Sequence, residues 1–170
     1  MIPACNIPRV ALRVRAEPIS HAAFAPFGEL VVHRGDTMRR YLDHAPDHIA
    51  PADAMRFWVS RYDAPKQAPL SYPKLERHPF SAQTFIPLAV KRYVVIAAPT
   101  RGGGGPDLAG LRAFVVGPGT GVSYRRATWH GPMTILDEPA ELAVTMWSTG
   151  DVKQDDEWFD LAEPLAVDID

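Results

Sequence analysis

Short apolar runs separated by proline, glycine or aspartate recur along this chain at intervals of about 8 to 15 residues. Runs of this length and spacing are typical of β-strands joined by turns, not of strands that alternate with helices. The 17 prolines fall between the runs rather than in one block, which favours the same interpretation. The pattern predicts an all-β fold, either a β-barrel or a double-sheet jelly roll. The runs are RFWVSRYDA, KLERHPF, QTFIPLAV, RYVVIAAP, LRAFVVG, GVSYRRATWHG, MTIL and ELAVTMW.

The segments outside these runs complete the predicted layout. Ser20 is a plausible N-cap for a short helix at residues 20–25, and PFGELVV then continues into a strand. The polar, proline-broken segment 34–53 predicts a loop with a short strand. RGGGG at 101–105 predicts a hairpin tip, because it lacks the lysine and hydroxyl residue of a phosphate-binding loop.

Length and composition predict one domain over residues 1–170, in which residues 151–170 form an acidic C-terminal tail. Charged residues are 22% and the net charge is -2, which argues against nucleic-acid and membrane partners. No apolar stretch is long enough to span a membrane and the opening lacks a signal-peptide core, so a cytoplasmic location is predicted. With only Cys5, an internal disulfide and a cysteine-rich zinc site are excluded.

The stretch LERHPFSAQTFIPL contains polar groups that are costly to bury unless they bind one another, a metal or a ligand. Glu76 and His78 are spaced to share one face of a strand, and Gln83 can return on the next strand. His130, after a glycine turn in GVSYRRATWHGP, is the candidate fourth group. The sequence therefore predicts a metal site made of Glu76, His78, Gln83 and His130.

This arrangement of Glu-x-His-x4-Gln and a later lone histidine resembles the two metal motifs of the cupin superfamily, with Glu76 at a usual histidine position and Gln83 at the usual glutamate position. A closer resemblance is to the ureidoglycolate lyase family, over residues 17–147. It implies a cupin-like β-barrel with one or two short helices, commonly a homodimer, that splits ureidoglycolate into glyoxylate and urea in allantoin catabolism. The segments that carry the resemblance are ISHAAFAPFGELV, LERHPFSAQTFIPL, PDLAGLRAFVV and GVSYRRATWHGPM.

Some positions depart from the pattern that this family usually shows. Gly131 stands where a second histidine is common, Ser123 replaces an asparagine, and Leu42 replaces the histidine of an Arg-Tyr-His-Asp stretch. Met146 begins a pair that is usually acidic then basic. The alternative hypothesis is therefore a divergent lyase, hydrolase or isomerase with another substrate, for example in a biosynthetic pathway, and a second alternative is a non-catalytic metabolite-binding cupin.

The proposed chemistry needs an ion, a carboxylate clamp and a proton donor. Nickel, manganese or zinc would suit the mixed nitrogen and oxygen ligands. Arg112, a strand arginine between apolar residues, is the predicted clamp, because its planar fork can bind a carboxylate through two hydrogen bonds. Lys91 or Tyr124 would protonate the leaving urea. Further predicted substrate-binding residues, from the resemblance, are Arg40, Tyr41 and Ser123.

Each of these assignments has a simpler alternative. Glu76 could pair with Arg77 or Arg92 in a surface charge cluster, and Arg112 could belong to a rim ion pair. The acidic segment 155–157 is most simply a solvated run of charges.

Overall fold

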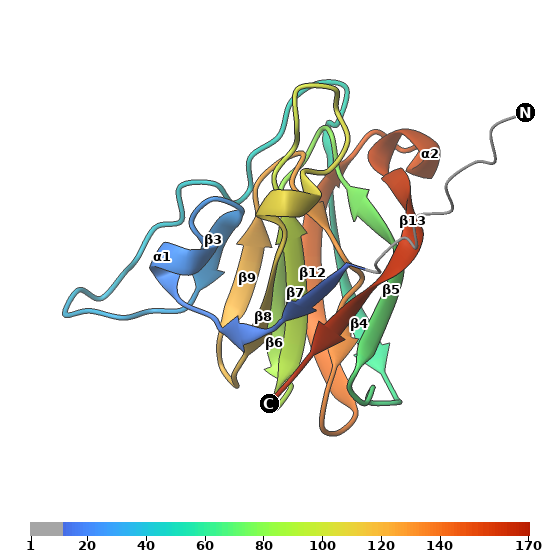
Figure 1. Cartoon of the computed structure of the whole chain (residues 1–170). Helices are drawn as coiled ribbons and strands as arrows, with labels where there is room; N and C mark the ends of the chain where they lie inside the picture. Colours follow the sequence, from blue (N-terminus) through green and yellow to red (C-terminus); the bar gives the residue numbers. More distant parts are fainter. Residues whose placement is uncertain (1–11) are drawn as a thin grey trace, which may run out of the picture.

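Two β-sheets and their connections make up the structure, a computed structural model that describes residues 12–170 (Figure 1). Cys5 lies outside the described residues. The predicted all-β, double-sheet barrel is confirmed, and so is the expectation of one or two short helices. Among the described residues no helix is long and apolar enough to cross a membrane.

The larger sheet has eight strands in the order β1-β13-β5-β10-β7-β8-β2, with β11 paired to β7. The two ends of this order, β1 and β2, are separated in sequence only by Ala16, so the sheet curls into a nearly closed barrel. Its strands are β1 (Arg13–Arg15), β2 (Glu17–Pro18), β5 (Leu70–Arg77), β7 (Tyr93–Ala98), β8 (Arg112–Val116), β10 (Trp129–His130), β11 (Thr134–Ile135) and β13 (Glu157–Asp168).

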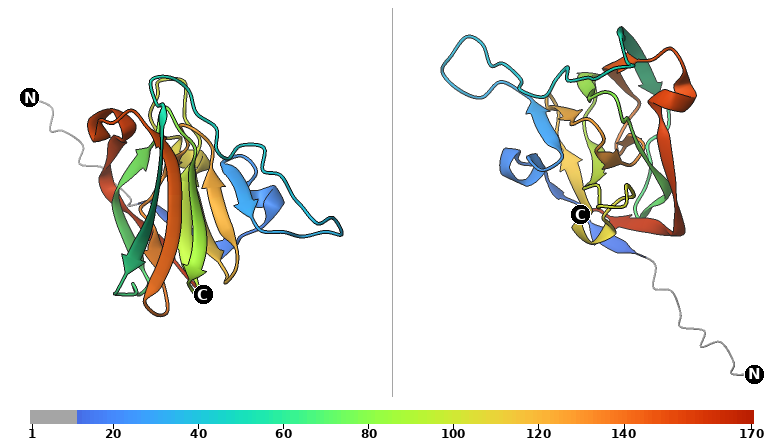
Figure 2. Two further views of the ribbon diagram at one scale, coloured as in Figure 1. Left: turned by 180° about the vertical axis from the view of Figure 1, so that it is seen from behind. Right: turned by 90° about the horizontal axis from the view of Figure 1, so that it is seen from above.

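The smaller sheet has five strands in the order β3-β9-β6-β12-β4 and packs against the larger one, as the view from above in Figure 2 shows. Its edge strand β4 pairs along its whole length with β12. Its strands are β3 (Gly28–Val31), β4 (Ala54–Tyr62), β6 (Gln83–Ala89), β9 (Gly121–Tyr124) and β12 (Ala140–Ser148).

Two apolar cores follow from this arrangement. One lies between the sheets and joins Phe85 and Leu142 of the smaller sheet to Tyr93 and Phe114 of the larger one. The other contains side chains of the larger sheet and its flanks, with Trp129 among them. Alternate residues of a strand point to opposite faces, so β10 sends Trp129 into the second core and His130 toward the first.

The short helices and turns agree with most of the sequence prediction. Helix α1 (His21–Phe24) starts after Ser20, whose hydroxyl accepts a hydrogen bond from the Ala23 amide at 3.2 Å, as the N-cap prediction required. The 101–105 segment forms a turn, and a 3-10 helix, η1 (Leu108–Gly110), follows it. The long 34–53 connection reaches outward in Figure 2, and its predicted short strand is reduced to one isolated bridge between His48 and Ser81.

The C-terminal segment differs from its prediction as an acidic tail. Residues 151–170 contain helix α2 (Val152–Asp155) and the twelve-residue strand β13, which lies between β1 and β5. Leu165 and Val167 of β13 are fully buried. Sequence analysis missed this strand, because acidic residues interrupt the alternation of apolar and polar positions in the part of β13 that precedes Leu165.

Candidate active site

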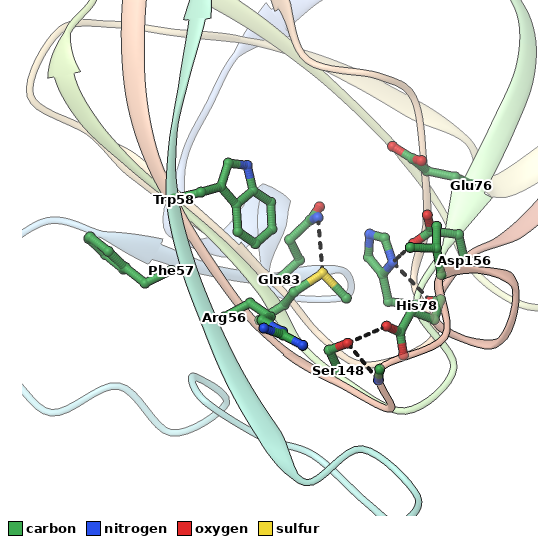
Figure 3. Close-up of a pocket in the computed structure, with 12 residues that line it drawn as sticks. Arg56, Phe57, Trp58, Glu76, His78, Gln83, Ser148 and Asp156 are labelled. Atoms are coloured by element: carbon green, nitrogen blue, oxygen red, sulfur yellow. Dashed lines mark hydrogen bonds and ion pairs between the residues drawn. The ribbon is translucent and has the colours of Figure 1, made fainter.

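Strands of both sheets bring Glu76, His78 and Gln83 to the wall of one cavity, and His130 lies within metal-ligand range of the first two. Glu76 near the end of β5 is the cross-strand partner of His130 on β10, and His78 follows β5 directly. Gln83 begins β6, which lies in the opposite sheet, so it reaches the cavity from the other side. Figure 3 shows Glu76, His78 and Gln83 lining this cavity. The two sheets thus converge on the point where the sequence predicted a site.

The ligand atoms of Glu76, His78 and His130 lie within 4.8 Å of one another, and these residues could hold a metal ion. Both histidines are buried, and neither Nε2 atom has a hydrogen-bond partner among the described residues. The Oε1 atom of Gln83 is buried and unpartnered in the same way. Leaving three buried acceptors unsatisfied is costly unless something binds them. A cation fits this donor set, because every unpartnered atom can offer a lone pair.

The other ring nitrogen of each histidine fixes its orientation. Nδ1 of His78 lies 3.0 Å from Oδ1 of Asp156 and 3.2 Å from the Asp155 carbonyl oxygen. Nδ1 of His130 donates to the Thr128 carbonyl oxygen at 2.9 Å. Because Nδ1 carries the proton in each bond, the lone pair of Nε2 is directed to the cavity, which is the usual arrangement around histidine ligands.

Burial controls the charges of the cluster. Desolvation lowers the pKa of His130 to about 3, so its imidazole is neutral and able to bind a metal at neutral pH. Desolvation also raises the pKa of Glu76 above its ordinary value. For His78, burial works against protonation, but the hydrogen bond to Asp156 and the Glu76 charge outweigh it and raise the pKa. The carboxylates of Glu76 and Asp156 therefore make the surroundings of the His78 ring electrostatically negative, which favours a positive charge in this part of the cavity, as expected where a cation would sit.

The acidic segment after β12 belongs to this site, and the hypothesis that 155–157 is a solvated run is wrong for its first two residues. The Asp155 side chain is buried and accepts hydrogen bonds from the Ser148 hydroxyl at 2.6 Å and the Thr149 amide at 2.8 Å. Asp156 holds the His78 ring. The local signal in the sequence was Asp151, which caps α2 by accepting a hydrogen bond from the Lys153 amide.

Replacing Asp156 by alanine should weaken metal binding about 10- to 100-fold, because partners that orient a ligating histidine typically contribute that much. The affinity can be measured by competition with a chromophoric chelator. Asp160→Ala on exposed β13 is the matched control and should bind as the wild type does. Equal affinities for all three proteins would remove Asp156 from the site.

The simpler hypothesis for Glu76, a surface charge cluster, is not what the structure shows. Arg77 pairs with Glu157 at 2.7 Å, and Arg92 pairs with Asp137 at 2.7 Å. The Glu76 carboxylate instead lies 3.7 Å from Nε2 of His130.

The predicted substrate-binding residues lie elsewhere in the described structure, and none of them lines this cavity. Arg112 forms an ion pair with Glu17 and donates to the Ala23 carbonyl oxygen at 3.1 Å, which matches the alternative hypothesis for it. The other three are placed as follows: Arg40 donates to the Leu30 and Val32 carbonyl oxygens, Tyr41 is 78% exposed, and Ser123 is bonded to Thr84.

The two candidate proton donors have very different surroundings. Lys91 is exposed in the turn between β6 and β7. Tyr124 is buried, pairs across β9 and β6 with Gln83, and stacks on His130 with 4.3 Å between ring centroids. Its hydroxyl has no partner among the described residues. Burial raises the pKa of Tyr124 well above 10, so this hydroxyl keeps its proton at neutral pH.

The opposite wall of the cavity comes from β4, which sequence analysis did not connect to the site. Arg56 and Trp58 alternate on one face of β4 and pair across the sheet with Met146 and Val144 of β12. The cavity has a volume of about 490 Å³. The alternation in RFWVSRY predicted a strand at this position, but the sequence does not show that this strand pairs with β12.

Of the departures from the usual pattern, only Met146 faces the cavity, where its sulfur accepts a hydrogen bond from Nε2 of Gln83 at 3.6 Å. Gly131 faces the other core, and a Cβ there would meet Tyr72 and Ile96 at 3.3 Å. Leu42 lines a separate hollow beside Arg40. The glycine at position 131, where a histidine is usual, therefore does not enlarge the cavity.

The family profile and the sequence relatives agree on one family. A family profile described as Ureidoglycolate lyase matches residues 11–168. A ureidoglycolate lyase of Mesorhizobium japonicum is 33% identical over 142 residues, covering 78% of this chain and 84% of that protein. One from Pseudomonas syringae pv. tomato is 31% identical over 161 residues, covering 89% and 93%. Among solved structures, a dTDP sugar isomerase from Desulfovibrio desulfuricans G20 covers 78% of this chain and 84% of its own, with TM-score 0.43 and 19% identity.

Proposed function

This chain belongs to the ureidoglycolate lyase family, and from that premise we propose that it is a carbon–nitrogen lyase that cleaves ureidoglycolate into glyoxylate and urea. The observation that carries the proposal is the convergence of two imidazole nitrogens and one amide oxygen, all buried and unpartnered, beside Glu76. Family membership alone would leave open whether this chain keeps a working site.

The reaction needs a proton removed from the substrate hydroxyl and a proton delivered to the departing nitrogen. The C–N bond breaks, its electron pair goes to nitrogen, and the carbinol carbon becomes the aldehyde carbon of glyoxylate. When bound, a divalent ion would polarise the substrate oxygens and lower the pKa of the hydroxyl. Glu76, His78, Gln83 and His130 are the proposed ligands.

In this reaction the protein orients the two imidazole rings and donates a proton to the leaving nitrogen. Asp156 and the Thr128 carbonyl hold the two imidazoles with Nε2 toward the cavity. Tyr124, protonated and stacked against His130, is the proposed donor to the urea nitrogen. Lys91 is not favoured, because it lies in an exposed turn, whereas Tyr124 contacts the proposed ligand His130 directly.

The test is metal analysis of protein purified without chelator, followed by measurement of urea and glyoxylate released from ureidoglycolate. Bound metal with equal amounts of both products supports the proposal. Bound metal without turnover favours a divergent enzyme with another substrate. A metal-free protein that binds glyoxylate but does not turn over ureidoglycolate favours a non-catalytic binding protein.

A further inference from the structure

A negatively charged substrate would enter a cavity that is already acidic. Glu76, Asp155 and Asp156 all line it. The Asp155 carboxylate is buried beside it and accepts hydrogen bonds from the Ser148 hydroxyl and the Thr149 amide. The substrate carboxylate therefore needs a cationic side chain from the protein in addition to any ion at the histidines.

Arg56 is the only lysine or arginine among the described residues that line the cavity. Its side chain has neither a hydrogen bond nor an ion pair with any residue in the described part of the chain, 12–170. Arg112 and Arg40, by contrast, are already occupied by Glu17 and by main-chain carbonyl oxygens. The exposed, unpartnered guanidinium of Arg56 and the unpartnered ligand atoms of His78 and Gln83 line the same cavity, which points to a ligand that spans the two sides.

The position of Arg56 in the fold suits this task. It lies on β4 directly across from Met146, which in turn pairs with Gln83 on the next strand. Figure 3 shows Arg56 on the side of the cavity opposite Glu76 and His78. A small hydroxy acid can therefore have its hydroxyl near the histidines and its carboxylate directed toward β4.

We propose that Arg56 is the residue that binds the substrate carboxylate, through the two parallel hydrogen bonds that a guanidinium can make. The inference rests on the proposed function for the identity of the substrate, but the role of Arg56 can be tested without turnover. It assigns selectivity for 2-hydroxy acid derivatives to β4 rather than to Arg112 on β8.

The first experiment compares two substrates that differ only in the carboxylate: ureidoglycolate and N-hydroxymethylurea, which would give urea and formaldehyde. Arg56→Gln should lower kcat/KM for ureidoglycolate about 10- to 100-fold and change kcat/KM for N-hydroxymethylurea less than about 3-fold. Arg56→Lys should lose part of the activity on ureidoglycolate, since a point charge cannot reproduce the paired geometry. Equal losses on both substrates would overturn the proposal, because they would indicate a structural effect.

The second experiment does not depend on catalysis. Titration calorimetry with glyoxylate should show about 10-fold or weaker binding to Arg56→Gln than to wild type, at equal metal content and melting temperature. Arg61→Gln, on the same strand but exposed and paired with Asp63, is the matched control and should bind as wild type does. If wild type has no lyase activity but this difference appears, the proposed function fails and the role of Arg56 stands. The proposed role of Arg56 is overturned if Arg56→Gln binds glyoxylate as wild type does, or if wild type does not bind glyoxylate.

Discussion

Replacing His130 by alanine is expected to abolish metal binding and lower kcat/KM for ureidoglycolate by at least about 10³-fold, because metal assistance is worth several kcal/mol and each 1.36 kcal/mol is tenfold. His130 is 2% exposed and its Nε2 has no other described partner, so no neighbouring group can take over its place. Metal content by atomic spectroscopy and product release by the lyase assay provide the two measurements. His33→Ala, at an exposed position, is the control and should change neither.

A His130→Leu variant separates loss of a ligand from loss of the fold. Leucine fills a similar volume and removes the unsatisfied Nε2, which costs on the order of 1–3 kcal/mol when nothing binds it. Leucine also removes the hydrogen bond from Nδ1 to the Thr128 carbonyl oxygen, so the two effects offset each other and the metal-free variant should melt close to the metal-free wild type. Added metal should raise the melting temperature of the wild type only, since ligands stabilise the state that binds them. A variant that still gains stability from metal would show that His130 is not a ligand.

The sequence predicted the strands better than it predicted their partners. Short apolar runs located most of the strands, and the spacing of Glu76 and His78 located one side of the site. The contribution of β4 could not be predicted, because Arg56 and Met146 are ninety positions apart and meet only through the β4–β12 ladder. Arg112 was a reasonable candidate by residue type, but pattern alone does not reveal that Glu17 of the parallel strand β2 binds it.

The C-terminal segment illustrates a second limit. Charge density identified 151–170 as acidic and suggested solvent exposure, which is the usual state of such runs. In the fold, Asp155 is buried because hydroxyl and amide donors from the end of β12 satisfy it, and Asp156 has a histidine partner. Local composition cannot report a partner that lies about eighty residues away, and here that partner is His78. The predicted homodimer stays a prediction.

Replacing Tyr124 by phenylalanine is expected to lower kcat for ureidoglycolate by about 10²-fold, the lower end of the range for general acid catalysis, because a group with a strongly raised pKa is a reluctant acid. The metal content should not change, since the ring still stacks on His130. Stability should be equal or slightly higher, because the removed hydroxyl is buried without a described partner. Lys91→Gln tests the competing donor and should retain full activity.

Tyr93→Phe is the matched control for this change. Tyr93 lies in the same core as Tyr124, but its hydroxyl donates to the Thr120 carbonyl oxygen at 2.7 Å. Removing that hydrogen bond should cost about 1 kcal/mol of stability and leave kcat unchanged. The two variants thus have opposite expected profiles, one losing rate and the other losing stability. If Tyr124→Phe kept full kcat while Lys91→Gln lost it, the proton would come from the exposed turn, and a movement of that turn toward the barrel would be needed to explain it.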